Sequence, residues 1–185
     1  MASQALAHVE FTNDTVKPNS SLNTFLAVPH GCSGSDTISL NVTAPTSVQL
    51  GLVPQQVQNW TLTVNYADAS NKTVKDFCWT GYLAHDGKQL FGLDVTVPNV
   101  DLSKTPNVTV LFPTVQTCLN ATSNWTSDPS SPSYNASVNK PAPALVITNA
   151  QETTTPVTSD GVSVTQLSMM AVAMVTLLSS HLVLA

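Results

Sequence analysis

Charged residues are scarce in this chain of 185 residues, in which Asp, Glu, Lys and Arg together make up 9%. An average soluble protein has roughly a quarter. Only six residues are Lys or Arg, and the formal net charge is −5. Proteins that bind nucleic acid need a basic patch to neutralise phosphates, so the composition argues against nucleic acid as a partner. Hydrophobic residues still supply 42% of the chain, which is enough for a folded core.

A helical hydrophobic period is also missing from the first 150 residues. Short stretches of alternating apolar side chains, rich in β-branched residues, are instead separated by turn residues. This pattern predicts an all-β fold, namely an antiparallel β-sandwich, with Trp60 and Trp79 in its core. The expected strands are 8–13, 22–29, 37–42, 48–53, 60–66, 73–79, 90–97, 107–112, 115–119, 124–126 and 142–148, with 60–66 and 73–79 as a hairpin.

The cysteines include no Cys-x-x-Cys pair, which disfavours a zinc site. There are three of them, Cys32, Cys78 and Cys118, so one disulfide would leave one thiol unpaired. Spacing alone leaves all three pairings open. Cys78 lies within an apolar, strand-like run, where we expect a small buried residue.

Sequons for N-linked glycosylation are abundant, and none is blocked by proline. Attached glycans would supply the solubility that charge does not, and they indicate a secreted eukaryotic protein. The tryptophans beside Asn59 and Asn124 leave the use of these two sites open. The nine acceptor residues are Asn13, Asn19, Asn41, Asn59, Asn71, Asn107, Asn120, Asn124 and Asn135.

Both ends of the chain resemble targeting segments. Residues 1–7 have no basic start and no long apolar stretch, so we interpret them as an incomplete signal-peptide remnant before a domain at 8–148. Residues 149–161 form a Thr-rich stalk that we expect to be disordered. Small residues beginning at Ser159, a polar spacer and the apolar tail of 162–185 are typical of a GPI-attachment signal, with Ser159 as the attachment residue.

The tail predicts where the protein is found. A GPI anchor would hold the protein in the outer leaflet, on the extracellular face of the plasma membrane or in the cell wall. The alternative is a single C-terminal membrane-spanning helix. The apolar tail is barely long enough to span, and no basic residue follows it, so we favour the lipid anchor.

A histidine stands directly after a candidate cleavage site. Ala5-x-Ala7 has the small residues that signal peptidase requires, and cleavage after Ala7 would make His8 the first residue. Its α-amine and imidazole Nδ1 could then chelate one metal ion. Two nitrogens in a plane suit Cu(II). Glu10, two residues further along the same strand face, is a candidate oxygen donor.

Two motifs carry a resemblance to a known family. They are the Val-Pro-His-Gly-Cys loop at 28–32 and the Phe-Pro-x-Val-Gln-x-Cys strand at 112–118, and the other landmarks follow in order. With them, the chain resembles the YcnI-like copper-binding domain family from about residue 8 to 146. The other landmarks are His8-Val9, Asn59-Trp60-Thr61, Trp79-Thr80-Gly81, Trp125 and Pro141–Leu145.

The resemblance implies an immunoglobulin-like or cupredoxin-like β-sandwich whose N-terminal histidine, here His8, holds Cu(II) through its amine and imidazole. It implies that Trp125 lies beside the copper and that Cys32 pairs with Cys118. The family completes its site with an acidic residue, but Leu90 occupies that position here. The carboxylate candidates are therefore Asp94, Asp86 and Glu10.

Together these features predict a cell-surface copper(II)-binding protein, and not an enzyme, that serves copper acquisition, buffering or handover. Its partner would be a copper transporter or chaperone. One alternative is a glycosylated wall or adhesion module without metal. The other is a copper-dependent polysaccharide-oxidising enzyme, which would need a second histidine. Only His30 and His85 could supply it, and we expect both in structural loop or surface roles.

Overall fold

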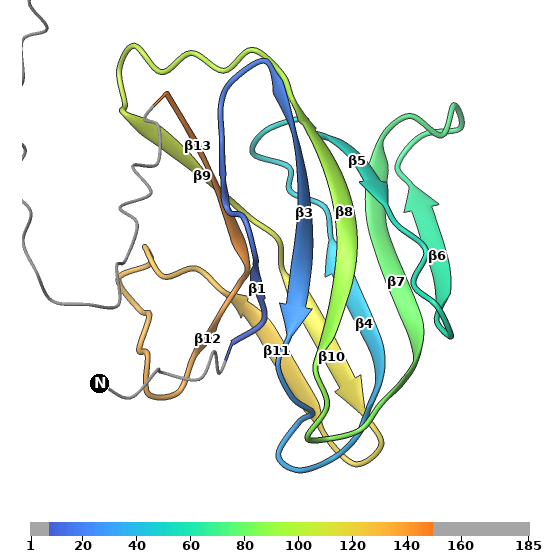
Figure 1. Ribbon diagram of the computed structural model, residues 1–185. Helices are drawn as coiled ribbons and strands as arrows, with labels where there is room; N and C mark the ends of the chain where they lie inside the picture. The colour runs from blue at the N-terminus through green and yellow to red at the C-terminus, as the bar shows by residue number, and fades with distance from the viewer. Residues whose placement is uncertain (1–7, 150–185) are drawn as a thin grey trace, which may run out of the picture. The chain divides into compact units, whose positions relative to one another are not determined.

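The structure, a computed structural model, describes residues 8–149, which contain strands and no helix. Four strands form one sheet in the order β1-β3-β8-β5, and six form another in the order β12-β11-β10-β4-β7-β6. Figure 1 shows β3 and β8 in front of β4 and β10, with β13 and β9 of the smaller sheet β2-β13-β9 beside them. The predicted all-β sandwich is confirmed. The strands are β1 (Glu10–Phe11), β2 (Thr15–Val16), β3 (Ser20–Val28), β4 (Thr37–Thr43), β5 (Gly51–Pro54), β6 (Thr61–Tyr66), β7 (Val74–Leu83), β8 (Gln89–Val97), β9 (Asn107–Leu111), β10 (Thr114–Cys118), β11 (Thr122–Ser127), β12 (Lys140–Pro141) and β13 (Ala144–Thr148).

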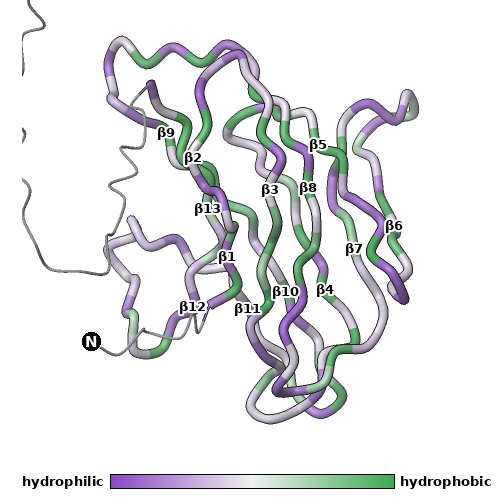
Figure 2. Tube along the Cα trace, in the orientation of Figure 1, coloured by the Kyte–Doolittle hydropathy of each residue, from purple (hydrophilic) through white to green (hydrophobic). Residues whose placement is uncertain are grey.

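The core lies between the sheets because side chains alternate along each strand. On β8, Phe91 and Leu93 are almost fully buried, whereas Leu90 is exposed on the outer face. Figure 2 shows this alternation of hydrophobic and hydrophilic residues along the central strands. Trp60 and Trp79 pack against Phe91 with ring centroids 4.9 and 5.0 Å away, so their predicted place in the core is confirmed.

Two short strands depart from the expected pattern. The stretch between the expected strands 8–13 and 22–29 contains β2, which pairs parallel with β13, and β12 pairs parallel with β11. The sandwich is therefore not purely antiparallel. A strand of two residues has too few side chains to show an alternation, and its existence depends on a partner distant in sequence.

The prediction of a buried thiol at Cys78 is wrong. The side chain is half-buried on the outer face of the six-stranded sheet, with its Sγ 3.3 Å from the Ser39 hydroxyl. The cause is strand alternation: Phe77 and Trp79, its neighbours on β7, both point into the core and have no exposed surface. When all residues of a run are apolar, the sequence does not show which of their side chains face solvent.

Several expected segments lie outside the described residues. They are the signal-peptide remnant at 1–7, almost all of the stalk, Ser159, and the tail at 162–185. Between His8 and Asn149, the structure contains no helix long and apolar enough to cross a membrane.

Candidate metal-binding site

His8 is an exposed residue two positions before β1. Its imidazole lies against Trp125 of β11, with the ring centroids 5.7 Å apart and the rings inclined by 62°. β1 belongs to the four-stranded sheet and β11 to the six-stranded sheet. The structure therefore brings together two predicted site residues that are more than a hundred positions apart in the sequence.

Trp125 is held on several sides and is only 2% exposed. The Lys140 ammonium lies 4.8 Å from the centroid of its ring and donates a hydrogen bond to the Ser123 hydroxyl at 2.6 Å. A cation at this distance over an indole is attracted to the ring. The Trp125 Nε1–H donates to Gln116 Oε1 at 3.0 Å. The indole can therefore form a rigid, water-excluding wall beside His8.

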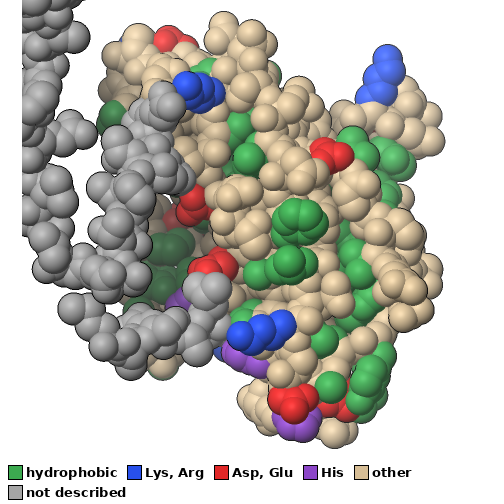
Figure 3. All heavy atoms as spheres, viewed as in Figure 1, with side chains coloured by type: hydrophobic (Ala, Val, Ile, Leu, Met, Phe, Trp, Pro, Cys, Tyr) green, Lys and Arg blue, Asp and Glu red, His purple; other side chains and the backbone are tan. Residues whose placement is uncertain are grey.

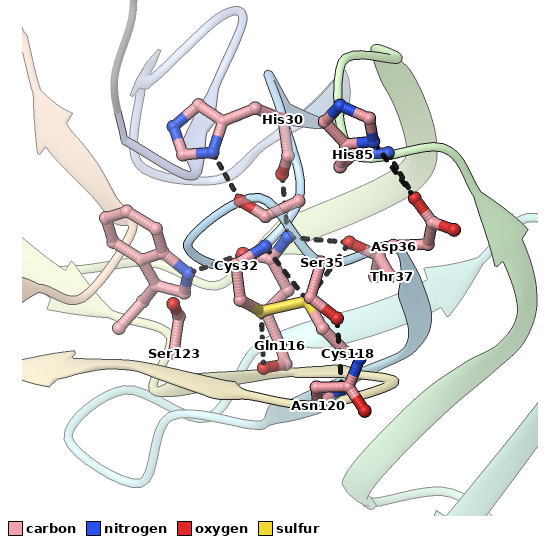
Figure 4. Close-up of a disulfide and its surroundings, with 12 residues drawn as sticks. His30, Cys32, Ser35, Asp36, Thr37, His85, Gln116, Cys118, Asn120 and Ser123 are labelled. Carbon is pink, nitrogen blue, oxygen red and sulfur yellow. Dashed lines mark hydrogen bonds and ion pairs between the residues drawn. A yellow bond between two sulfur atoms is a disulfide. The ribbon is translucent and has the colours of Figure 1, made fainter.

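Gln116 connects this wall to the loop after β3. Its side chain has no exposed surface, and its Nε2 donates to the His30 carbonyl and to the Thr37 hydroxyl, both at 2.8 Å. Figure 4 shows the Gln116 side chain close to the disulfide, with dashed lines for its hydrogen bonds to His30 and Thr37. Sequence reasoning did not single out Gln116 as a site residue. Its polar position inside a Phe-Pro-x-Val-Gln-x-Cys strand was the available signal, because a buried amide needs partners.

The disulfide implied by the family resemblance is confirmed. Cys32, in the loop after β3, is bonded to Cys118 at the end of β10, across a sequence separation of 86 residues. Both cysteines are buried. The bond joins the His30 loop to β10, the strand that carries Gln116.

The acidic candidates are separated by the fold. Glu10 and His8 line one groove of about 380 Å³, and Asp14, which the sequence analysis missed, lines it as well. Beyond β1 the chain continues along β3, with the Asn13 amide bonded to the Thr24 hydroxyl, and Asp14 follows directly. Asp14 is the middle residue of the Asn13 sequon, and this motif gives no indication of metal binding.

Asp94 is not brought to His8. Its carboxylate accepts hydrogen bonds from the side-chain amides of Asn23 and Gln55, the latter at 2.6 Å. Asp94 pairs with Asn23 on β3, whereas Glu10 pairs with Ala27, so about 13 Å of strand separates the two positions. Asp94 was proposed because it lies near Leu90 in the sequence. Which carboxylate lies near β1 depends instead on how β1 and β8 are paired with β3.

The other two histidines of the domain occupy structural positions. The His30 Nδ1 bonds to the Gly31 carbonyl at 2.6 Å. The main chain of His85 donates to Asp36 at 2.7 Å and accepts from the Gly31 amide at 2.8 Å, which ties two loops together. The hydrogen bond from the Tyr82 hydroxyl, followed by that from the His85 amide, lowers the pKa of Asp36 from its ordinary value.

The described side chains do not group as metal ligands by themselves. Within residues 8–149, no three His, Cys, Asp or Glu side chains converge as a metal-binding cluster. An α-amine on His8, if the chain were cleaved after Ala7, would be a further nitrogen donor beside the imidazole.

The fold and the exposed N-terminal edge define an immunoglobulin-like β-sandwich with its candidate site beside β1. The family model described as "Domain of unknown function (DUF1775)" matches residues 8–147, and the chain belongs to this family. The YcnI family is DUF1775, so the resemblance drawn from the two motifs is confirmed at the level of the family. No curated protein matches the chain.

Two solved structures are similar to the chain. An uncharacterized protein from Nocardia farcinica with an immunoglobulin-like fold is 20% identical, with a TM-score of 0.56 over 76% of this chain and 98% of that one. A type II cohesin domain from the cellulosome of Acetivibrio cellulolyticus is 10% identical, with a TM-score of 0.42 over 76% of this chain and 92% of that one. The first similarity supports the fold alone.

Proposed function

We propose that the mature protein binds Cu(II) through the α-amine and imidazole of His8, after cleavage behind Ala7. The observation that carries this proposal is the position of His8, exposed at the start of the domain with its ring against Trp125. The two nitrogens would form a chelate. Cu(II) favours such tetragonal nitrogen and oxygen sites and binds more tightly than the other common divalent metals.

The surroundings of His8 suit a cation. Two carboxylates, Glu10 and Asp14, line the same groove. Either could provide an oxygen ligand, and both would attract a divalent ion electrostatically. Trp125 limits the access of water from one side. An exposed site with few protein ligands suits acquisition, buffering or handover of copper, with a transporter or chaperone as the recipient.

This proposal predicts that copper binding requires a free amine on His8. A protein that begins at His8 should give an axial, nitrogen-coordinated Cu(II) EPR spectrum. The matched control is the same protein with the α-amine of His8 acetylated, which removes one chelating nitrogen and keeps the imidazole. We expect at least a hundredfold weaker binding in the control, because a chelating ligand is lost. Equal copper affinity of the two proteins would contradict the proposal.

The same proposal places the protein on the cell surface, carrying N-linked glycans and a GPI anchor. All nine sequon asparagines are exposed, including Asn59 and Asn124 beside the buried tryptophans. The tryptophans therefore do not bury the acceptor side chains. Exposure of the acceptor is a requirement for the finished glycan.

We expect the glycans to be countable by mass spectrometry. Enzymatic release of N-glycans converts each occupied Asn into Asp, so every used sequon gains about one dalton in its peptide. Peptides carrying Asn71 and Asn120, at hairpin turns, should show the conversion. Secreted protein whose mass does not change after this treatment would contradict glycosylation. Release from cells by a phosphatidylinositol-specific phospholipase tests the anchor separately.

A further inference from the structure

The outer face of the four-stranded sheet exposes apolar side chains at its centre. Phe25 on β3 is 39% exposed and Leu90 on β8 is 48% exposed. Figure 3 shows hydrophobic side chains gathered on this face, over β3 and β8. Neither residue belongs to the copper site proposed above. A single exposed apolar side chain needs no explanation, but apolar side chains exposed together on one sheet face can mark a binding surface.

The ring of Phe25 lies over a glycine. Phe25 pairs with Gly92 of β8, and a Cβ on Gly92 would lie 3.6 Å from Phe25 Cε1 and 3.0 Å from the Cβ of Gln55. The ring therefore reaches over a position without a side chain. One side of the Phe25 ring can therefore pack on the sheet while the other side faces solvent. The ring then forms a flat apolar surface.

A row of three hydrogen-bonded polar side chains lies beside this ring, from β3 across β8 to the residue after β5. The amides of Asn23 on β3 and Gln55 after β5 donate to the two carboxylate oxygens of Asp94 on β8. These bonds orient both carboxamides. Among residues 8–149 no group donates to the carbonyl oxygen of either amide, so two acceptors are free for a ligand. The charge of Asp94 is partly compensated by its two donors.

The acceptor asparagines lie outside the strands that carry this surface. None of the nine is on β3, β8 or β5, although Asn19 directly precedes β3 and its sequon continues into that strand. On the opposite sheet, Asn41 of β4 and Asn124 of β11 flank Val115 in a single row, so that outer face carries two sequons. We name the surface formed by Asn23, Phe25, Gln55, Leu90 and Asp94 the bare face.

We propose that the bare face binds an uncharged, β-linked polysaccharide. A β-linked pyranose presents C–H groups on its two faces and hydroxyls around its rim. Its faces can stack on Phe25 and Leu90 while its hydroxyls donate to the free amide oxygens of Asn23 and Gln55. A strongly charged ligand is disfavoured because Asp94 is the one charged group of the bare face. The binding needs no metal and is independent of the copper proposal.

The test is adsorption of the full glycosylated chain to insoluble cellulose and chitin. Phe25→Ala should weaken adsorption about tenfold, as expected when an aromatic contact residue is truncated. The matched control is Tyr66→Ala, because Tyr66 is 40% exposed but lies on β6 of the other sheet. That variant should adsorb like the unchanged protein. Asn23→Ala should also weaken adsorption, through loss of an acceptor and release of Asp94.

The outcomes separate this proposal from copper binding and from self-association. Adsorption should persist in EDTA and in the protein whose His8 amine is acetylated. Failure of the unchanged protein to adsorb to either polysaccharide would overturn the proposal, as would equal losses for Phe25→Ala and Tyr66→Ala. A concentration-dependent dimer abolished by Phe25→Ala would also overturn it, because a second copy would then cover the bare face. Thermal unfolding of each variant verifies that the fold is retained.

Discussion

Replacing Cys32 and Cys118 together by serine is expected to lower the free energy of unfolding by about 4 kcal/mol. The disulfide closes a segment with a sequence separation of 86 residues, and it restricts the unfolded chain accordingly. Both sulfurs are buried, so the serine hydroxyls would also enter an apolar site. Denaturant unfolding followed by circular dichroism measures the change.

Cys78 provides the control for this experiment. Its half-buried thiol lies on the outer face beside the Ser39 hydroxyl, so Cys78→Ser should change stability by less than about 1 kcal/mol. A reducing agent should destabilise the unchanged protein and leave the double serine variant unaffected. If the double variant unfolds at the same denaturant concentration as the unchanged protein, the disulfide does not stabilise the fold as described.

Replacing Gln116 by alanine is expected to cost about 3 kcal/mol of stability and to loosen Trp125. The amide satisfies three buried or partly buried groups: the Trp125 indole N–H, the His30 carbonyl and the Thr37 hydroxyl. Its removal leaves a cavity and unpaired polar groups in the interior. Thermal unfolding measures the stability, and the indole N–H resonance of Trp125 in NMR spectra reports on its environment.

The matched control for Gln116 is Gln89→Ala. Gln89 lies on β8, and within residues 8–149 its side-chain amide donates to the carbonyl of the adjacent Leu90 alone. We expect little loss of stability and no movement of the Trp125 resonance in this variant. If the Gln116 variant is also weakened in copper binding at His8, the indole wall contributes to the site. Equal stabilities of the two variants would show that the buried amide is not the link between β10 and Trp125.

The alternation of apolar and polar residues predicted most of the strands, because every second side chain of a half-buried strand faces the core. The Trp60 hairpin and the alternation of β8 are examples. The same reasoning failed for Cys78, because a run of apolar residues does not reveal which of them faces outward. It also missed β2 and β12, because two-residue strands are defined by their partners rather than by a pattern.

Some residues of the candidate site could be predicted from the sequence, and others could be found only in the structure. His8 and Trp125 were chosen from local sequence and family resemblance, and the structure brings their rings together. The choice among carboxylates could not be made from sequence, because it depends on the register of β1 and β8 against β3. Gln116 was missed because hydrogen-bond partners of a buried amide come from strands and loops far along the chain.

The sequence by itself determined the all-strand fold class, the positions of the sequons and the histidine that follows a candidate cleavage site. These are properties of periodicity and short motifs, which adjacent residues encode. Only the tertiary structure decided that Glu10 and Asp14 share a groove with His8 and that Asp94 belongs to the bare face instead. Such neighbourhoods arise from strand pairing and sheet packing, which join residues with no local relation in the chain.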